Sequence, residues 1–544
     1  MNFALDKKYF KIAFYSIILI EFFSLYAFAF PLLNKIFFIL ILLGVLFLAW
    51  RNLFYGVLII LSELIIASKG YLFYFEAGEK AISIRIGLFA VVMSVFAFKV
   101  FLKYFKTKKL EIAFLKSKLF PYFLILFLFI IYGVISGIMH KNQLSNVFFD
   151  SNGWLYFLLA FPIFEVIRKD NFNKLFSVLL AALTALILKT FFLLFIFSHN
   201  FIGITPEIYR WVRITGVGEI AKMETGFFRI FLQSHIYAVL TFFILLPILN
   251  KKFVQRWGCH QAPISSKFPY FSKFLSKIFG LCGCISKKFD KEISLKSENL
   301  SQNRCFATAP ESIKSNKLFL SLIIFLASVI IISFSRSFAV GIIATFFVYY
   351  IYHLVFKKEK IKSIFVSFLV VLVIFVSAIG LSGFLIEAPI PFRERSDIDF
   401  ISSLSKRATE DDVAIGSRWG LLKPLWKEVK ENSILGAGFG KTVTYKTEDP
   451  RALENNPNGL YTTYAFEWGY LDIWLKLGLF GLLAYLLLLF QIIKQGHQKQ
   501  QNKIILGSIL GVIALTAIHF FTPYLNHPLG IGYLLLWSAV YGEE

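Results

Sequence analysis

Residues 363–386 read SIFVSFLVVLVIFVSAIGLSGFLI and contain no charged side chain. An α-helix needs about 20 predominantly apolar residues to cross the hydrocarbon core of a bilayer, so this run predicts a membrane-spanning helix. Similar runs recur along all 544 residues, of which 57% are hydrophobic and 66 are Phe. This pattern excludes a soluble enzyme, a fibrous protein and a disordered regulator. The runs do not alternate polar with apolar residues, which excludes a β-barrel.

We therefore expect an all-α polytopic membrane protein with about 12–14 transmembrane helices and a helical cap outside the membrane. Four of the candidate spans are short, which is why the lower number stays open. The fourteen candidate spans are approximately residues 12–33, 36–50, 53–68, 82–102, 119–139, 153–167, 175–198, 226–249, 318–334, 338–356, 363–386, 469–493, 503–521 and 528–541.

The positive charge is distributed in a way that predicts the orientation of the chain. Its formal net charge of +24 sits in short clusters between the apolar runs, which excludes nucleic-acid binding and is typical of cytoplasmic loops. Every second connecting segment is basic, for example 103–109 and 357–362, whereas 69–80 and 140–152 are not. Both termini are thus expected in the cytoplasm. The first apolar run is long and is followed by another span, so we expect no cleavable signal peptide.

Two long hydrophilic segments divide the chain into five parts. We expect an N-terminal transmembrane bundle at 1–249, a basic cytoplasmic insert at 250–317, transmembrane helices at 318–386, an outer cap at 387–466 and C-terminal transmembrane helices at 467–544. In the insert, apolar residues at helical spacing predict an amphipathic helix on the anionic inner leaflet; an insert without any site is the alternative. These residues are Phe271, Phe274, Leu275, Ile278 and Phe279.

Neither the cysteines nor a glycine-rich stretch predicts a functional site. All four cysteines, Cys259, Cys282, Cys284 and Cys305, fall in the insert, and their spacing fits no common zinc pattern, so no metal is expected. Residues 436–442, GAGFGKT, resemble a phosphate loop but lack its first glycine and lie outside, where ATP is absent. We interpret these glycines as a turn that ends an amphipathic helix at 418–431.

Arginines near the outer membrane face are the first candidates for chemistry. Arg336 lies between the ninth and tenth spans, Arg229 lies one turn into the eighth span, and Arg213 lies in the outer loop before it. Outward arginines oppose the positive-inside bias, and a guanidinium fork binds phosphate oxygens in pairs. These residues suit a lipid-linked diphosphate; snorkelling, or pairing with Glu219 or Glu224, is the alternative.

The C-terminal third carries a family resemblance. Gly416-Ser417-Arg418-Trp419 opens the cap helix, and residues 432–438, NSILGAG, follow it; Glu467-Trp468, nine residues, and a Gly-x-x-Gly element then open the next span. With Ser-Phe-Ser-Arg-Ser at 333–337, this order resembles the signature of the O-antigen ligase and O-antigen polymerase superfamily, over residues 226–490.

The resemblance implies a C-type glycosyltransferase of the bacterial inner membrane. Such an enzyme takes a glycan from an undecaprenyl-diphosphate donor on the periplasmic face, transfers it to a glycan or lipid A-core acceptor, and needs no metal or nucleotide cofactor. It further implies that Arg336, and one of Arg213 and Arg229, hold the diphosphate, that Arg418 acts from the cap, and that residue 467 activates the acceptor hydroxyl.

The chain departs from the family pattern at the proposed base. Position 467 is Glu where the family has His, and Trp468 replaces the usual amide. A glutamate is ionised at neutral pH and can accept a proton, so transfer remains possible; capping of the following helix is the alternative. His527 could supply an imidazole instead, whereas His235 and His519 lie within spans and are expected to be packed.

Other functions remain open at this point. Polymerase and ligase are not separated by these residues. A flippase or transporter of lipid-linked oligosaccharide would place its charges along a central cavity, and only Glu21, Glu63 and Lys189 are charges of that kind. A SEDS-type peptidoglycan polymerase is a further alternative.

Overall fold

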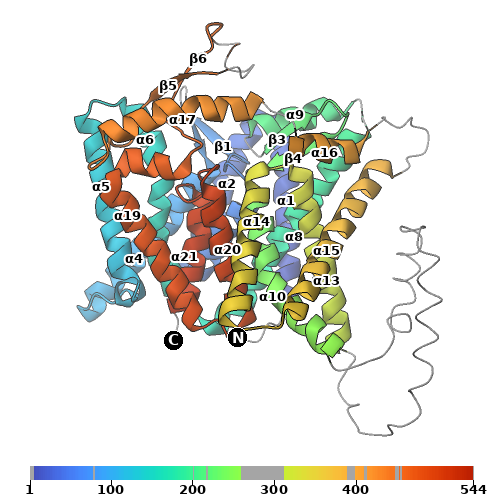
Figure 1. Cartoon of the computed structure of the whole chain (residues 1–544). Helices are drawn as coiled ribbons and strands as arrows, with labels where there is room; N and C mark the ends of the chain where they lie inside the picture. The colour runs from blue at the N-terminus through green and yellow to red at the C-terminus, as the bar shows by residue number, and fades with distance from the viewer. Residues whose placement is uncertain are drawn as a thin grey trace, which may run out of the picture.

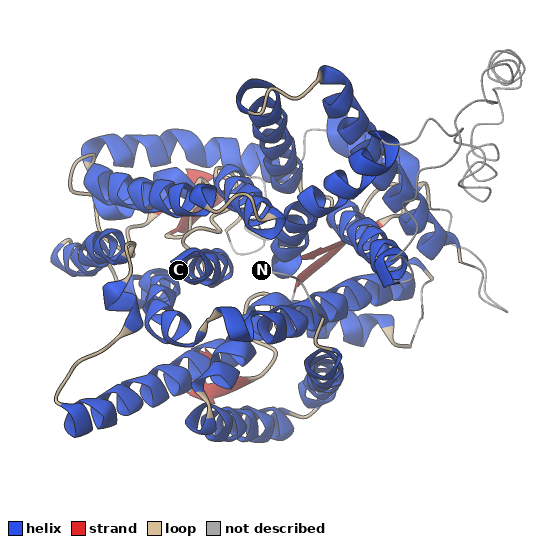
Figure 2. Cartoon of the chain, turned by 90° about the horizontal axis from the view of Figure 1, so that it is seen from below, coloured by secondary structure: helices blue, strands red, loops and turns tan. Residues whose placement is uncertain are grey.

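The chain forms a bundle of helices that run between two opposite ends, as the computed structural model shows (Figure 1). Both termini lie at the lower end in this view, and short helices and small sheets gather at the upper end. Seen from below, many helices appear nearly end-on (Figure 2). The structure describes residues 5–77, 80–199, 201, 203–215, 218–258, 311–388, 398–409, 413–447, 453 and 456–542.

Within these described residues, nine helical segments are long and apolar enough to cross a membrane. They are α1 (Lys7–Ala29), α2 (Pro31–Arg51), α4 (Ile84–Thr107), α5 (Phe120–Met139), residues 144–166, residues 169–198, residues 336–356, α15 (Ile361–Glu387) and α19 (Gly469–Gln498). Three of them are composite, made of α6 (Leu144–Ser151), η2 (Asn152–Leu159) and α7 (Ala160–Val166); of η3 (Lys169–Asn171) and α8 (Phe172–Ser198); and of α14 (Arg336–Ile351) and η6 (Tyr352–Phe356).

Shorter apolar helices complete the bundle. They are α3 (Leu53–Ile66), residues 233–249 in η4 (Gln233–His235) and α10 (Ile236–Gly258), residues 319–333 in α13 (Glu311–Ser333), α20 (Lys503–His519) and α21 (Pro528–Gly542). Each long or short segment overlaps one predicted span, in the same order. The predicted all-α polytopic membrane fold is therefore confirmed.

Local sequence signals set several helix ends. Asp6 accepts hydrogen bonds from the first amides of α1, Asn52 does so for α3, and Ser83 does so for α4. Pro31 is the first residue of α2, where a missing amide costs nothing. Such ends matter here because a helix in lipid must satisfy its backbone groups within the protein.

An outer layer covers the upper end of the bundle. It contains helices α9 (Thr205–Ile214), α16 (Phe400–Thr409) and α17 (Val413–Glu431), and α17 lies across the helices below it (Figure 1). Three antiparallel hairpins join them: β1 (Tyr74–Ala77) with β2 (Lys80–Ser83), β3 (Gly218–Lys222) with β4 (Phe228–Leu232), and β5 (Val443–Lys446) with β6 (Leu460–Thr463). At the lower end, the short helix η1 (Ala113–Lys116) connects α4 to α5.

The predicted eighth span is wrong at its start. The sequence predicts a helix over 226–232, with Arg229 one turn inside the span, but residues 228–232 form strand β4 and Arg229 faces Ala221 of β3. Burial alternates along the end of the strand, where Ile230 and Leu232 are buried. The pairing with β3 satisfies the backbone hydrogen bonds of β4. A hydropathy pattern alone does not separate these apolar residues from the helix that follows them.

Most of the predicted cytoplasmic insert lies outside the described residues. Helix α10 continues to Gly258 and α13 begins at Glu311, so the two apolar spans extend beyond their predicted ends. The amphipathic helix predicted at Phe271–Phe279 and all four cysteines fall between these helices, in the part that the structure does not describe.

Candidate active site

Helix α17 is held over the bundle by one of its faces. Residues at helical spacing on this face pack into a small core with the turn that follows α17, strand β5 and the start of α19. The members of this core are Leu421, Leu425, Val429, Ala437, Val443, Phe466 and Leu475. The predicted amphipathic helix is therefore present, and its apolar face fixes the cap to α19.

The turn after α17 enters a break in α19. Gly478 has φ +72°, which interrupts the helix, and the amide of Leu479 donates to the carbonyl oxygen of Ser433 over 3.0 Å. Gly436 has φ +75°, and a Cβ there would lie 2.5 Å from the nitrogen of Gly478. The glycines at 436–440 thus form a turn after α17, as predicted. The chain at this turn supplies a hydrogen-bond partner for the backbone of α19 at its break, where the helix itself offers none.

Across this contact, Arg418 pairs with Glu467. Arg418 Nε donates to Glu467 Oε2, and the Arg418 side chain is 29% exposed while that of Glu467 is 51% exposed. The indole nitrogen of Trp468 donates to the Arg418 carbonyl oxygen over 2.9 Å. The N-cap of α19 is Trp468 and no side chain caps it, so Glu467 serves the ion pair and not the alternative role as a helix cap.

Arg336 joins Arg418 in one pocket. It is the first residue of α14, after a turn in which Phe334 has φ +48°, and its Nη1 atom is buried. Arg336 and Arg418 line a pocket of about 150 Å³, which we name the arginine pocket. Its other lining residues are Ser337, Val340, Trp419, Trp468 and Phe521.

The other predicted arginines, Arg229 and Arg213, do not line this pocket. Arg229 Nε donates to the Ser333 carbonyl oxygen over 3.0 Å, and its guanidinium lies 5.1 Å from the centre of the Phe231 ring. Ser333 begins the turn that leads to Arg336, so Arg229 supports this turn. Arg213 is instead paired with Glu219 of β3 at 3.6 Å. This pairing is the alternative that the sequence analysis named.

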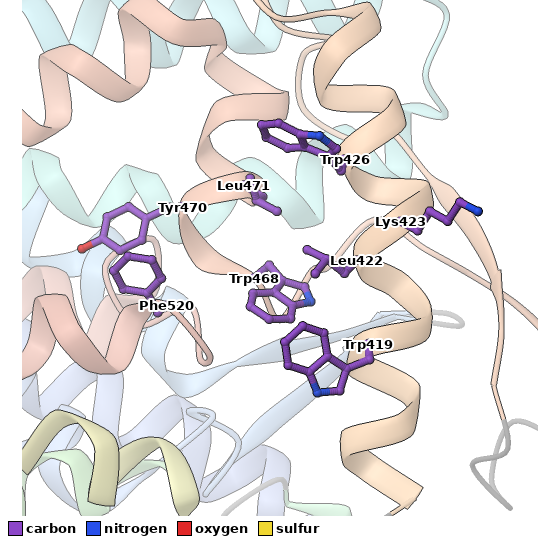
Figure 3. A pocket seen from close by; sticks show the side chains of 8 residues that line it. All are labelled: Trp419, Leu422, Lys423, Trp426, Trp468, Tyr470, Leu471 and Phe520. Atoms are coloured by element: carbon purple, nitrogen blue, oxygen red, sulfur yellow. The ribbon is translucent and has the colours of Figure 1, made fainter. Parts of the chain in front are cut away.

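A larger groove adjoins the arginine pocket. It has a volume of about 630 Å³ and lies between α17, the start of α19 and the end of α20 (Figure 3). We name it the aromatic groove; its lining residues are Trp419, Leu422, Lys423, Trp426, Trp468, Tyr470, Leu471 and Phe520. Trp419 and Trp468 belong to both cavities.

The sequence analysis missed a buried charge network below this site. Lys476 Nζ lies 2.5 Å from both Asp150 Oδ1 and Asp472 Oδ1, and all three side chains are at most 7% exposed. The amide of Gly440 donates to Asp150 over 2.8 Å, and Asn526 donates to Asp472. An Asp and a Lys four residues apart inside an apolar span were the available signal.

The intramembrane charges that the sequence left unexplained are also paired. Lys189 Nζ lies 2.7 Å from Glu21, and Arg85 Nε lies 3.0 Å from Glu63. Among the residues that the structure describes, no group of three or more His, Cys, Asp or Glu could hold a metal ion.

Of the three histidines named from the sequence, His519 lies against Gly469 at the start of α19, where a Cβ would lie 2.5 Å from its Cε1 atom. Burial lowers the pKa of His527 to about 3, and the charges of Arg85 and Lys69 add to this effect. Its Nδ1 accepts from the amide of Leu529 over 3.3 Å. His235 and His519 are fully buried, as expected for packed residues.

Comparison with known families adds to this geometry. Residues 321–486 match the model of a family described as O-antigen ligase. The match supports the predicted resemblance to the O-antigen ligase and polymerase superfamily over this part of the chain. The matched segment contains Arg336, Arg418 and Glu467, whereas Arg213 and Arg229 precede it. The protein is thus a polytopic membrane protein with a segment similar to this family. No curated protein and no solved structure matches the chain significantly.

Proposed function

We propose that this protein transfers or polymerises a glycan carried on undecaprenyl diphosphate, at the periplasmic face of the inner membrane and without a metal. One observation carries the proposal. Two arginines, Arg336 of α14 and Arg418 of α17, line one pocket, and Arg418 holds Glu467 at its edge. A phosphate-binding group and a general base thereby meet at the membrane surface.

The arginine pocket suits a diphosphate on electrostatic grounds. Each guanidinium stays charged next to hydrocarbon and binds phosphate oxygens through paired N–H groups. Arg336 and Ser337 also begin α14, whose N-terminus carries partial positive charge. Arg229, which supports the Ser333 turn, is the second candidate for the diphosphate, and Arg213 is the third because it is already paired.

The chemistry follows from this placement. The acceptor hydroxyl oxygen attacks the anomeric carbon of the donor sugar, the bond from that carbon to the phosphate oxygen breaks, and the electron pair leaves with the diphosphate. Glu467 accepts the hydroxyl proton. Fixed donors that stabilise the departing charge are worth about 2.7–4 kcal/mol each, by analogy with oxyanion holes.

Arg418 can bind Glu467 and the diphosphate at the same time. A guanidinium carries five N–H donors, and the bond to Glu467 uses only Nε, so the Nη groups can hold phosphate oxygens. The same side chain would then connect the base to the diphosphate site. This arrangement offers a physical reason why a glutamate can stand at position 467, where the family has histidine.

The orientation of the protein supports the periplasmic face. Both termini lie at the lower end of the bundle, and the arginine pocket lies at the upper end with α17 (Figure 1). The basic connecting segments belong to the end of the termini, which the positive-inside rule assigns to the cytoplasm. Membrane lipid surrounds the bundle, and the acceptor is a glycan or a lipid A-core.

A complementation experiment tests the proposal. In cells that lack the native gene, Arg336→Ala, Arg418→Ala and Glu467→Gln should each abolish the surface glycan at unchanged protein level. Arg210→Ala is the matched control, because Arg210 is exposed and pairs with nearby Glu207 at 3.1 Å.

The products that accumulate identify the reaction. Single repeats on the outer acceptor indicate a polymerase, and undecaprenyl-linked polymer indicates a ligase. Purified protein should also form new glycosidic bonds in detergent, which a flippase or transporter cannot do. Normal glycan from all three variants would refute the catalytic proposal.

A further inference from the structure

The aromatic groove contains more aromatic side chains than a surface that only faces lipid would need. Five of its eight lining residues are aromatic, and three of those are tryptophans. Trp419 is 59% exposed, Phe520 is 55% exposed and Trp426 is 38% exposed, so their rings are accessible. Trp419 and Trp426 lie on a face of α17 other than the one that packs into the core with Leu421 and Leu425.

The groove is continuous with the catalytic residues in sequence and in space. Trp419 directly follows Arg418, and Trp468 directly follows Glu467. The two indole rings meet edge to face, with their centres 5.4 Å apart, and both line the arginine pocket as well. The Arg418–Glu467 pair therefore lies where the two cavities adjoin.

We propose that the aromatic groove binds the acceptor saccharide, an inference that rests on the proposed function. In a displacement at the anomeric carbon, the attacking oxygen and the leaving oxygen lie on opposite sides of that carbon. The arginines mark the side of the leaving diphosphate. Glu467, which takes the proton of the attacking hydroxyl, borders the groove through Trp468, so the saccharide that carries this hydroxyl lies in the groove.

The chemistry of the lining favours a sugar over a hydrocarbon chain. Sugar rings present flat faces of C–H groups, which pack on the negative faces of aromatic rings, whereas their hydroxyls need polar neighbours. The groove offers indole and phenol rings together with Lys423. Its rings are also held in place: Trp426 meets Trp474 at 5.7 Å, and Trp474 donates to the Ser433 carbonyl oxygen over 2.8 Å.

The position of the groove agrees with this occupant. Trp468 precedes α19 and Phe520 follows α20, so the groove lies where these helices end, beneath α17 (Figures 1 and 3). An isoprenoid chain would instead run along the helices below, where Phe480 and Leu483 of α19 are exposed. Tryptophans at this height are also typical interfacial anchors, which is the competing explanation that the experiment must separate.

Steady-state kinetics of the purified protein in lipid nanodiscs tests the inference. The donor is the lipid-linked glycan extracted from cells that lack the gene. The acceptor is the lipid-free oligosaccharide released by mild acid from the surface glycolipid of the same cells. Trp419→Ala and Trp426→Ala should each raise the KM for the acceptor by about tenfold, the size expected for the loss of one ring-stacking contact. The donor KM should stay unchanged in Trp426→Ala, because Trp426 does not line the arginine pocket, and Trp426→Phe should restore most of the acceptor affinity.

Two exposed aromatic residues elsewhere provide matched controls. Tyr26 near the end of α1 is 50% exposed and Trp50 near the end of α2 is 51% exposed. Their alanine variants should leave both KM values unchanged. An equal loss in these controls would show that the groove tryptophans are only membrane anchors.

The outcomes separate this inference from the proposed function. A raised donor KM in Trp426→Ala, with the acceptor KM unchanged, would place the donor in the groove and overturn the inference. Unchanged kinetics in both tryptophan variants, combined with inactive Arg336→Ala, would refute the acceptor groove alone. Active Arg336→Ala and Glu467→Gln would refute the proposed function itself.

Discussion

Arg418 of α17 is hydrogen-bonded to Glu467, which precedes α19, so the cap and the membrane bundle meet in one ion pair. The two residues are 49 positions apart in sequence. Their approach depends on the core under α17 and on the turn that enters the break in α19. The site is therefore built by packing of the outer layer and not by any single motif.

We expect that lysine cannot replace either arginine of the arginine pocket without a loss of activity. Lysine keeps the charge but loses the planar fork that binds two phosphate oxygens, so Arg336→Lys and Arg418→Lys should lower the rate of glycan transfer about 10²-fold or more. The rate is measured with purified protein and lipid-linked donor. Arg210→Lys, at an exposed pair, should keep the wild-type rate. A wild-type rate in both pocket variants would mean that a point charge suffices.

Loss of the buried lysine should destabilise the protein strongly. Lys476→Met leaves Asp150 and Asp472 facing each other in a buried site, and breaking such a network typically costs about 3–5 kcal/mol. Thermal unfolding in detergent measures this loss. The triple variant Asp150→Asn, Asp472→Asn and Lys476→Met removes all three charges and should recover much of the stability. Equal stability of Lys476→Met and the wild type would contradict a structural role for the network.

The turn after α17 should not tolerate a side chain at Gly438. This residue has φ +77°, and a Cβ there would lie 2.0 Å from the nitrogen of Gly137 in α5. Gly438→Ala should lower both the unfolding temperature and the activity. Gly44→Ala is the control, since nothing lies within 4 Å of a Cβ at that helical position, and it should be neutral or slightly stabilising. Equal behaviour of the two variants would argue against the close packing of this turn.

Acid should destabilise the protein partly through His527. Its pKa is lowered to about 3 in the folded protein, while the unfolded chain takes up a proton near pH 6.5. Protons therefore bind preferentially to the unfolded state between these values, so this contribution to stability is complete above pH 6.5 and declines as the pH falls.

The variant His527→Asn keeps an acceptor for the Leu529 amide but does not titrate. We expect it to match the wild type at pH 8 and to lose less stability at pH 5. The midpoints of thermal unfolding at pH 8, 6 and 5 check this expectation. Parallel pH profiles of the two proteins would exclude His527 as the group responsible.

Chemical labelling should reveal the orientation of the chain. Lys427 lies on α17 and its side chain is 75% exposed, so Lys427→Cys should react with a membrane-impermeant maleimide in intact cells. The four native cysteines, predicted in the cytoplasm, serve as the internal control and should react only after permeabilisation. The opposite pattern of labelling would show that the chain has the opposite orientation in the membrane and would refute a periplasmic site.

The sequence predicts the spans well because their cause is local. A helix such as α15 must be apolar over its whole length to lie in lipid, and no distant residue changes that requirement. The strand at Arg229 escaped this reasoning because its other four residues, Phe228, Ile230, Phe231 and Leu232, are as apolar as the helix that follows. Only the pairing of β4 with β3 distinguishes the two.

The candidate site was predictable only in part. The family resemblance singled out Arg336, Arg418 and Glu467, which the structure brings together. Contacts across long sequence separations were not accessible, and Lys476 with Asp150, 326 positions apart, is the clearest case. The aromatic groove was hidden for a related reason: the sequence shows the tryptophans of α17, but only packing determines which of its faces stays uncovered.

The interruption of α19 at Gly478 has a mechanical consequence. The helix consists of two rods, residues 469–477 and residues 479–498, joined at a residue with a non-helical backbone. The upper rod is tied to α17 through Leu475, and the lower rod remains embedded among its neighbours. A force that moved α17 toward the bundle would rotate the upper rod about Gly478. Glu467, which precedes this rod, would move with it.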